Sequence, residues 1–111
     1  MKLDETQVGG TLCVAPAGRL DTLSTPVLEA ALQARISAEV KTVVLDLAAV
    51  DYVSSAALRV FLSSARRFGE AGGRLVFCGL TDNVRKVFAI SGFESILEIH
   101  ADRAAAIAAV G

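Results

Sequence analysis

Ser54 and Ser55 are adjacent hydroxyl side chains at a point where the sequence pattern changes from strand to helix. Upstream of the pair, residues 43–47 form a short, mostly apolar run of the kind that fills the inner strands of a covered sheet. A helix that begins at the pair leaves backbone N–H groups without intrahelical partners, and such groups bind anions. A phosphate ester on one of these serines would therefore lie against the start of the helix.

The same two serines have a purely structural explanation. Serine is among the preferred N-cap residues of helices, where its side-chain oxygen accepts a hydrogen bond from a backbone amide and contributes roughly 1 kcal/mol. Helix starts are rich in serine for this reason, so the spacing alone favours capping over regulation. On the residue pattern alone, both roles stay open.

The segment that follows the serines predicts one amphipathic helix over residues 55–71. Apolar and polar side chains recur three and four residues apart and so fall on opposite sides of it. Glycines at positions 72 and 73 suit the left-handed conformation that closes many helices. The expected core face consists of Leu58, Phe61, Leu62, Ala65 and Phe68, and the expected solvent face of Arg59, Ser63, Arg66, Arg67 and Glu70.

Strand and helix patterns alternate along the rest of the chain. Gly9-Gly10 predicts a tight hairpin, because glycine tolerates positive φ. Thr25 and Asp82 are the expected N-caps of two further helices. We expect strands at 3–8, 11–17, 74–79 and 96–99, and helices at 26–39, 82–90 and 102–110.

This order of elements defines the expected architecture. A hairpin followed by a strand–helix–strand unit, from Val43 through Phe77, predicts a mixed sheet with a parallel crossover. The predicted fold class is α/β, with a mixed β-sheet opened by an antiparallel hairpin and packed with about four helices. Residues 1–111 are expected to form a single domain, since their number suits one core.

Charge and hydropathy exclude several classes of function. The net charge is −1, from 11 basic and 12 acidic side chains, so no basic field is expected for nucleic acid or a membrane surface. The longest apolar run, at 43–50, contains Asp46 and falls short of the ~20 residues that a membrane span needs. The first residues lack an apolar signal region, and a cytoplasmic protein is expected.

Catalytic and metal-binding patterns are missing from the sequence. Cys13 and Cys78 lie in separate apolar runs and are expected to be buried free thiols. With His100 they give three scattered ligands, whereas a zinc site needs about four, so no metal is expected. The chain has no Gly-x-Ser-x-Gly elbow and no glycine-rich phosphate loop, so neither an enzyme nor a bound cofactor is predicted. His100 is expected near the surface or a strand end.

The chain resembles a STAS domain of the anti-sigma factor antagonist family. The core motif of that family reads approximately Asp-Leu-Ser-x-Val-x-Phe/Tyr-hydrophobic-Asp/Ser-Ser-Ser/Ala-Gly-Leu and precedes an amphipathic helix. Gly18-Arg19-Leu20-Asp21 also resembles the turn after the second strand of the family, and the resemblance extends over nearly all 111 residues. The motif is matched by Asp46-Leu47, Val50, Tyr52-Val53, Ser54-Ser55-Ala56 and Leu58-Arg59.

The resemblance implies a regulatory mechanism called partner switching. In that family a partner anti-sigma factor, itself a serine kinase, phosphorylates a serine at the start of the motif helix, and a PP2C-type phosphatase removes the phosphate. The unphosphorylated protein binds the kinase and releases its target, whereas phosphorylation blocks binding. The expected output is transcription regulation, without direct contact to nucleic acid.

The position of the phosphorylated serine depends on how the motif aligns. Well-known members phosphorylate the second serine of Asp-Ser-Ser-Gly, whose place is taken here by Ala56. A sister pattern, Ser-Ser-Ala-Gly-Leu-Arg, makes Ser55 the first choice and Ser54 the second. Ala57 replaces the family glycine, a change that a helical backbone accepts.

The expected partner-binding surface surrounds these serines. Each further candidate has a structural alternative as a turn residue, cap, loop acid, core-edge aromatic or solvated helix charge. A competing function is a STAS accessory subunit of a transporter or signalling complex, never phosphorylated, in which the serines only cap the helix. The candidates for partner binding are Asp21, Ser24, Asp51, Tyr52, Ser54, Ser55 and Arg59.

Overall fold

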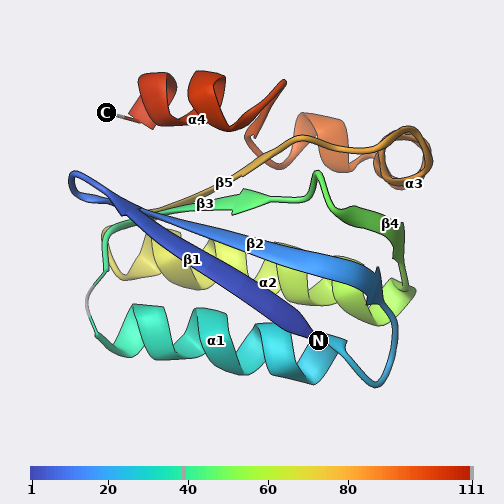
Figure 1. Ribbon diagram of the computed structural model, residues 1–111, viewed down its shortest axis with the longest axis horizontal. Coiled ribbons are helices and arrows are strands. Elements are labelled where there is room, and N and C mark those ends of the chain that lie inside the picture. The colour runs from blue at the N-terminus through green and yellow to red at the C-terminus, as the bar shows by residue number, and fades with distance from the viewer. Residues whose placement is uncertain (39, 111) are drawn as a thin grey trace.

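A six-stranded sheet lies between two layers of helices in the computed structural model, which describes residues 1–38 and 40–110. Helices α1 and α2 cover one face of the sheet, and α4 lies on the opposite side (Figure 1). The strands are β1 Lys2–Val8, β2 Thr11–Leu20, β3 Thr42–Asp46, β4 Val50–Val53, β5 Arg74–Cys78 and β6 Ile99–His100. The helices are α1 Thr25–Ser37, α2 Ser55–Glu70, α3 Asp82–Ser91 and α4 Arg103–Val110, with a 3₁₀ turn at Phe93–Ser95.

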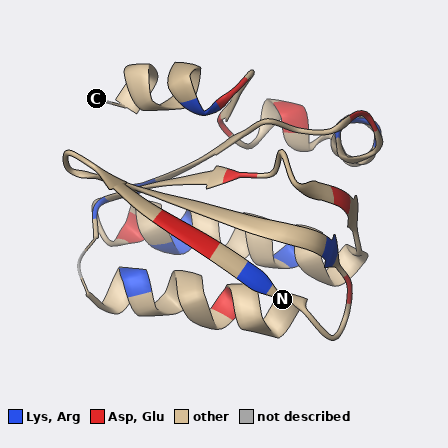
Figure 2. Cartoon of the chain, in the orientation of Figure 1, with Lys and Arg blue, Asp and Glu red and all other residues tan. Residues whose placement is uncertain are grey.

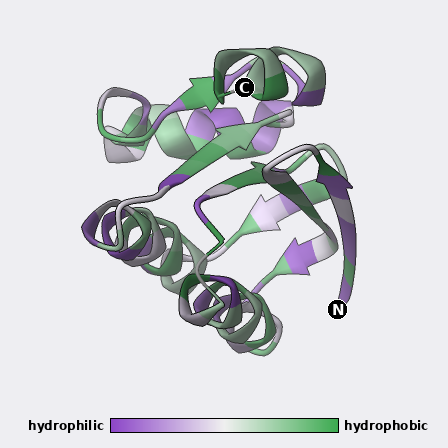
Figure 3. Ribbon diagram, turned by 90° about the vertical axis from the view of Figure 1, so that its left-hand side faces the viewer, coloured by the Kyte–Doolittle hydropathy of each residue, from purple (hydrophilic) through white to green (hydrophobic). Residues whose placement is uncertain are grey.

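The predicted α/β fold with its mixed sheet is confirmed. Strands β1 and β2 form the predicted antiparallel hairpin, and Gly9 at its turn has φ +59°. The order is β1-β2-β3-β5-β6, and each pairing beyond the hairpin is parallel. The edge strand β1 is largely hydrophilic, whereas the inner strands are largely hydrophobic (Figure 3).

Strand β4 was not predicted, because the sequence indicated only a short turn between β3 and the motif helix. β4 pairs with the end of β2, at Gly18–Leu20, after the earlier part of β2 has paired with β3. The register shifts between Gly18 and Arg19, where Gly18 has φ +101°. Val50 and Val53 are buried and the two residues between them exposed, so no alternating pattern revealed the strand.

Two predicted helix starts are wrong by one residue. Ser24, not Thr25, precedes α1, and the Thr25 hydroxyl inside the helix donates a hydrogen bond to the Asp21 carbonyl at 2.5 Å. Thr81, not Asp82, precedes α3, and Asp82 lies in the first turn. The predicted end of the first helix at Glu39 lies outside the described residues. The predicted end of α3 is confirmed, since Gly92 is left-handed with φ +75°.

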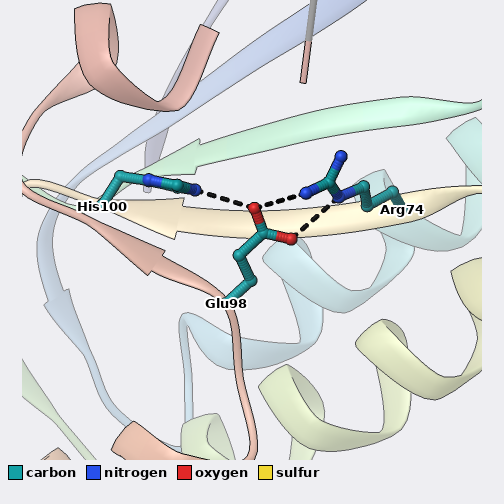
Figure 4. A network of polar contacts seen from close by, with 3 residues as sticks. All are labelled: Arg74, Glu98 and His100. Atoms are coloured by element: carbon teal, nitrogen blue, oxygen red, sulfur yellow. Dashed lines mark hydrogen bonds and ion pairs between the residues drawn. The ribbon is translucent and has the colours of Figure 1, made fainter. Parts of the chain in front are cut away.

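The predicted last strand at 96–99 is wrong in position. A 3₁₀ turn occupies Phe93–Ser95, Ile96 is 60% exposed, and the strand is only Ile99–His100. A hydrogen-bond network joins this strand to β5, with Glu98 lying between Arg74 and His100 (Figure 4). Arg74 donates to the two Glu98 oxygens at 2.8 and 2.6 Å, and the His100 ring nitrogen lies 2.8 Å from one of them. His100 is therefore at a strand end, as expected.

Helix α2 is anchored in the main core. The Phe61 ring lies 5.3 Å from that of Phe77 on β5 and 6.0 Å from that of Phe88 on α3. The buried side chains of α2 are Ala57, Val60, Phe61, Ser64 and Phe68, whereas the predicted core residues Leu58, Leu62 and Ala65 are half-buried against them. The predicted helix is confirmed, with its buried face rotated slightly, and this packing holds the helix start in place.

Helix α4 covers a second, smaller core on the opposite face. Its one buried residue, Ala106, contacts a cluster that contains both cysteines, Val44 and Val76. Cys13 and Cys78 are buried and free, as predicted. Burial raises the pKa of both thiols, that of Cys78 to about 12, so they are protonated at neutral pH.

Candidate phosphorylation and partner-binding site

The two serines of the motif occupy different positions at the start of α2. Ser54 is the N-cap, with extended backbone angles (φ −84°, ψ 169°), and its hydroxyl oxygen accepts a hydrogen bond from the Ala57 amide at 3.2 Å. Its own amide donates to the Leu20 carbonyl at 2.8 Å. Ser55 is the first residue of the helix and is exposed, and its hydroxyl makes no hydrogen bond to another described residue. Capping therefore belongs to Ser54 and leaves the Ser55 hydroxyl accessible.

The first turn of α2 is electrostatically suited to an anion. It contains no acidic residue, and the unpaired amides of a helix start carry partial positive charge. Arg59 is exposed and follows Ser55 by four residues, a spacing that places two side chains about 5–6 Å apart at their β-carbons. A phosphate on Ser55 would thus have a cation one turn away on the same helix.

A tight turn at Asp21–Ser24 lies beside this helix start. The Asp21 carboxylate accepts hydrogen bonds from the amides of Leu23 at 3.0 Å and Ser24 at 2.9 Å. The Ser24 hydroxyl donates to the Arg19 carbonyl at 2.6 Å. The hydrogen bond from the Ser24 amide is the main cause that lowers the pKa of the Asp21 carboxyl. Asp21 and Ser24 therefore hold one turn together.

The guanidinium group of Arg19 lies over the ring of Tyr52. The guanidinium carbon of Arg19 lies 4.1 Å from the ring centroid, in the range of a cation–π interaction, and the two residues are register partners in β2 and β4. Tyr52 is 40% exposed, so the ring lies at the surface rather than beneath the turn. Its neighbour Asp51 is also exposed.

Arg59 faces an open groove between α1 and α2. The groove has a volume of about 330 Å³. Ala56, next to Ser55, belongs to its lining, so the groove adjoins the helix start. The full lining consists of Thr22, Thr25, Pro26, Glu29, Ala56, Arg59, Val60 and Ser63.

The structure thus gathers the predicted residues around one end of β2, β4 and α2. The hydrogen bond from Ser54 to Leu20 joins the Asp21–Ser24 turn to the helix start, and β2–β4 pairing joins Tyr52 to Arg19. Arg19 and Leu23 were not among the predicted site residues. The partner of Tyr52 could not be identified without β4, and the exposure of Leu23 has no signal in the sequence.

Three properties of the described residues bear on other classes of function. Acidic and basic segments are interspersed over the molecule rather than gathered on one face (Figure 2). Within residues 1–38 and 40–110, no three His, Cys, Asp or Glu side chains form a group that could hold a metal ion. None of the described helices combines the length and apolar character of a membrane span.

Comparison with known proteins gives the family. The family model of the STAS domain matches residues 2–106. The chain belongs to the STAS domain family. A protein of Bordetella bronchiseptica that carries the name anti-sigma factor antagonist BtrV is 42% identical to this STAS domain over 109 residues, covering 98% of this chain and 94% of its own.

Solved structures show the same fold. An anti-sigma factor antagonist of Thermotoga maritima matches with a TM-score of 0.92 at 16% identity and covers 97% of this chain and 93% of its own. The Bacillus protein SpoIIAA matches in its unphosphorylated form with a TM-score of 0.83 at 22% identity, covering 98% of this chain and 96% of its own. Its phosphorylated form matches with a TM-score of 0.76 at 20% identity, covering 99% of this chain and 100% of its own.

These comparisons confirm the resemblance seen in the motif. This STAS domain is homologous to proteins named anti-sigma factor antagonists.

Proposed function

We propose that this STAS domain is an anti-sigma factor antagonist that works by partner switching, with Ser55 as the phosphorylated residue. The observation that carries the proposal is the division of roles between the two serines. The Ser54 hydroxyl accepts a hydrogen bond from the Ala57 amide, whereas the next residue, Ser55, is exposed. The 42% identity to BtrV and the existence of a phosphorylated form of SpoIIAA support the proposal.

In the proposed reaction, a partner anti-sigma factor acts as the serine kinase. The Ser55 oxygen attacks the γ-phosphorus of ATP, forms the phosphate ester and loses its proton, while ADP leaves. The STAS domain contributes only a positioned hydroxyl, because its helix start is held by the core and by the Ser54–Leu20 hydrogen bond. Catalytic groups come from the kinase.

Phosphorylation would switch binding through charge. A phosphoserine carries about −1.5 to −2 charges at neutral pH, so it adds desolvation cost in a packed interface and repels nearby carboxylates such as Asp51. A loss of about 3 kcal/mol in affinity would reduce kinase binding more than a hundredfold. The fold need not change, because the helix start itself can accept the phosphate.

The reverse step would be hydrolysis of the ester by a PP2C-type phosphatase. Ser55 is exposed at the start of α2, which leaves its phosphate accessible to a second enzyme. Transcription regulation as the output and a cytoplasmic location stay predictions from the sequence.

Mass spectrometry tests the acceptor directly. The full chain is incubated with ATP and each purified anti-sigma-type serine kinase of its source genome, and intact and peptide masses are compared among variants. We expect one added phosphate on the wild type and on Ser54→Ala, and none on Ser55→Ala. Ser37→Ala, which removes another exposed serine hydroxyl at the end of α1, is the control and should accept phosphate like the wild type. Phosphate that persists on Ser55→Ala would contradict the proposal.

A second candidate function has one specific observation in its favour. Ser54 does cap α2, as a STAS accessory subunit that is never phosphorylated would require. This alternative predicts no phosphate from kinases that are shown to be active on other substrates. Transporter genes beside the gene of this chain would favour it, whereas genes for a serine kinase and a PP2C-type phosphatase would favour the switch.

A further inference from the structure

Leu23 is 86% exposed at the tip of the Asp21–Ser24 turn. A single exposed leucine is not unusual on a protein surface. Its backbone, however, is held by the two Asp21 hydrogen bonds to the amides of Leu23 and Ser24. The Ser24 hydroxyl in turn bonds to the Arg19 carbonyl at 2.6 Å. The exposure of Leu23 is therefore imposed by an ordered turn rather than by a loose loop.

Leu23 lies in a segment that is hydrogen-bonded to the residue before Ser55. The Leu20 carbonyl accepts the Ser54 amide at 2.8 Å, and the turn that carries Leu23 begins at the next residue, Asp21. A standard interface covers about 800 Å² on each partner, so an interface centred on Ser55 extends over segments next to the helix start. The Asp21–Ser24 turn is one of these segments.

The surroundings of Leu23 indicate the chemistry of the partner surface. Arg19, with its guanidinium 4.1 Å from the Tyr52 ring centroid, presents a cation and an aromatic ring close to the turn. Arginine and tyrosine are enriched at the centres of interfaces, and an apolar anchor contributes most when it enters a pocket that excludes water. Asp51, next to Tyr52, is exposed as well, so the complementary surface is an apolar pocket whose polar rim meets both signs of charge.

We propose that Leu23 is the apolar anchor by which this STAS domain binds its serine kinase, inserted in an apolar pocket beside the kinase active site. This inference rests on the proposed function, because it takes the kinase as the occupant. The proposal adds Leu23, a residue outside the phosphorylated helix, to those that determine the affinity for the kinase. Phosphorylation and anchoring then act on one interface from two segments, α2 and the turn before α1.

Binding measurements on a matched pair of variants test the anchor. Leu23→Asn and Val8→Thr each replace a branched apolar side chain by a polar one of similar shape. Val8 is 41% exposed and pairs with Thr11, at the opposite end of β2 from Leu20. We expect Leu23→Asn to weaken calorimetric binding to the kinase that phosphorylates the wild type roughly 10- to 100-fold, as for loss of one buried leucine side chain. Val8→Thr should stay within about twofold of the wild type, and both variants should keep its melting temperature within a few degrees.

The outcomes separate the anchor from the proposed function. Equal affinity of Leu23→Asn and the wild type, or equal losses in both variants, would overturn the anchor alone. Sedimentation without the kinase tests whether Leu23 binds a second copy of this chain instead. If the wild type self-associates and Leu23→Asn is monomeric, the proposal that Leu23 anchors the kinase is overturned. A wild type that neither binds nor accepts phosphate from any anti-sigma-type kinase of its source genome would overturn the proposed function itself.

Discussion

Ser54 and Ser55 have the same side chain but different surroundings, and their hydrogen bonds show that Ser54 is the residue that caps α2. The Ser54 hydroxyl accepts the Ala57 amide, and its backbone amide bonds to Leu20. The Ser55 side chain lies one residue further along the helix, exposed to solvent. A modified Ser54 would lose its cap, whereas a modified Ser55 would keep it. Phosphorylation at Ser55 is therefore compatible with an intact α2.

The two serines should differ in their effect on stability. Ser54→Ala removes the acceptor of the Ala57 amide and should lower the free energy of unfolding by about 1 kcal/mol. Ser55→Ala removes an exposed hydroxyl and should change it by less than about 0.5 kcal/mol. Urea denaturation followed by circular dichroism measures both. Equal losses in the two variants would mean that the capping role is assigned to the wrong serine.

At the scale of elements, β4 links the site to the sheet. It connects the end of β2 to the start of α2, and α3 closes over it through the Thr81 hydroxyl, which donates to the Val50 carbonyl at 2.9 Å. On the opposite face, α4 is attached more weakly, with one buried residue. Its Arg103 donates to an oxygen of Asp46 at 3.0 Å, and the other oxygen of Asp46 accepts the Ala48 amide at 3.0 Å. One motif carboxylate therefore holds both the β3–β4 turn and α4.

Loss of that ion pair should loosen α4 over the buried thiols. The Arg103–Asp46 pair is partly exposed and is worth about 1 kcal/mol, so Arg103→Gln should speed cysteine labelling at Cys13 and Cys78 about fivefold. The thiols are slow to react in the wild type because burial raises their pKa and keeps them protonated. Labelling with a thiol reagent at pH 8, read by mass spectrometry, gives the rates.

A matched variant controls for the loss of a surface arginine. Arg66→Gln removes an exposed guanidinium on α2, far along the helix from its start, and should leave the labelling rate unchanged. Acceleration in both variants alike would mean that global unfolding, not release of α4, exposes the thiols.

At the scale of the whole molecule, one aromatic cluster holds the layers together. Phe61 of α2, Phe77 of β5 and Phe88 of α3 contact one another through tilted and edge-to-face rings with centroids 5.3 to 6.2 Å apart. Such pairs add to the free energy of burying the rings themselves. The cluster therefore sets where α2 lies, and with it the position of Ser55.

Removal of the α2 ring from this cluster should cost much of the stability of the fold. Phe61→Ala should lower the free energy of unfolding by about 3–5 kcal/mol, against a total of about 5–15 kcal/mol for a typical domain. Leu62→Ala, at the half-buried neighbouring position, should cost less than half as much. Urea midpoints for the two variants check the comparison, and similar losses would contradict the role of Phe61 as the main anchor of α2.

The sequence by itself determined the α/β class, the hairpin at Gly9-Gly10, the helix that begins at Ser55 and the buried cysteines. These features depend on the local periodicity of apolar residues and on glycines with positive φ. Only the tertiary structure decided that a strand lies before the helix and that Arg19 covers Tyr52, because β4 exists through pairing with distant β2 and has no alternating pattern.

Which of the two serines caps α2 was likewise decided by the tertiary structure. The local pattern permitted a cap at either residue, but the Leu20 carbonyl binds the Ser54 amide and holds Ser54 in an extended conformation just before α2. The exposure of Leu23 depends on the hydrogen bonds of its turn in the same way. The local sequence pattern predicted that both serines lie at a helix start. Contacts between segments distant in sequence determine which of the two hydroxyls is accessible.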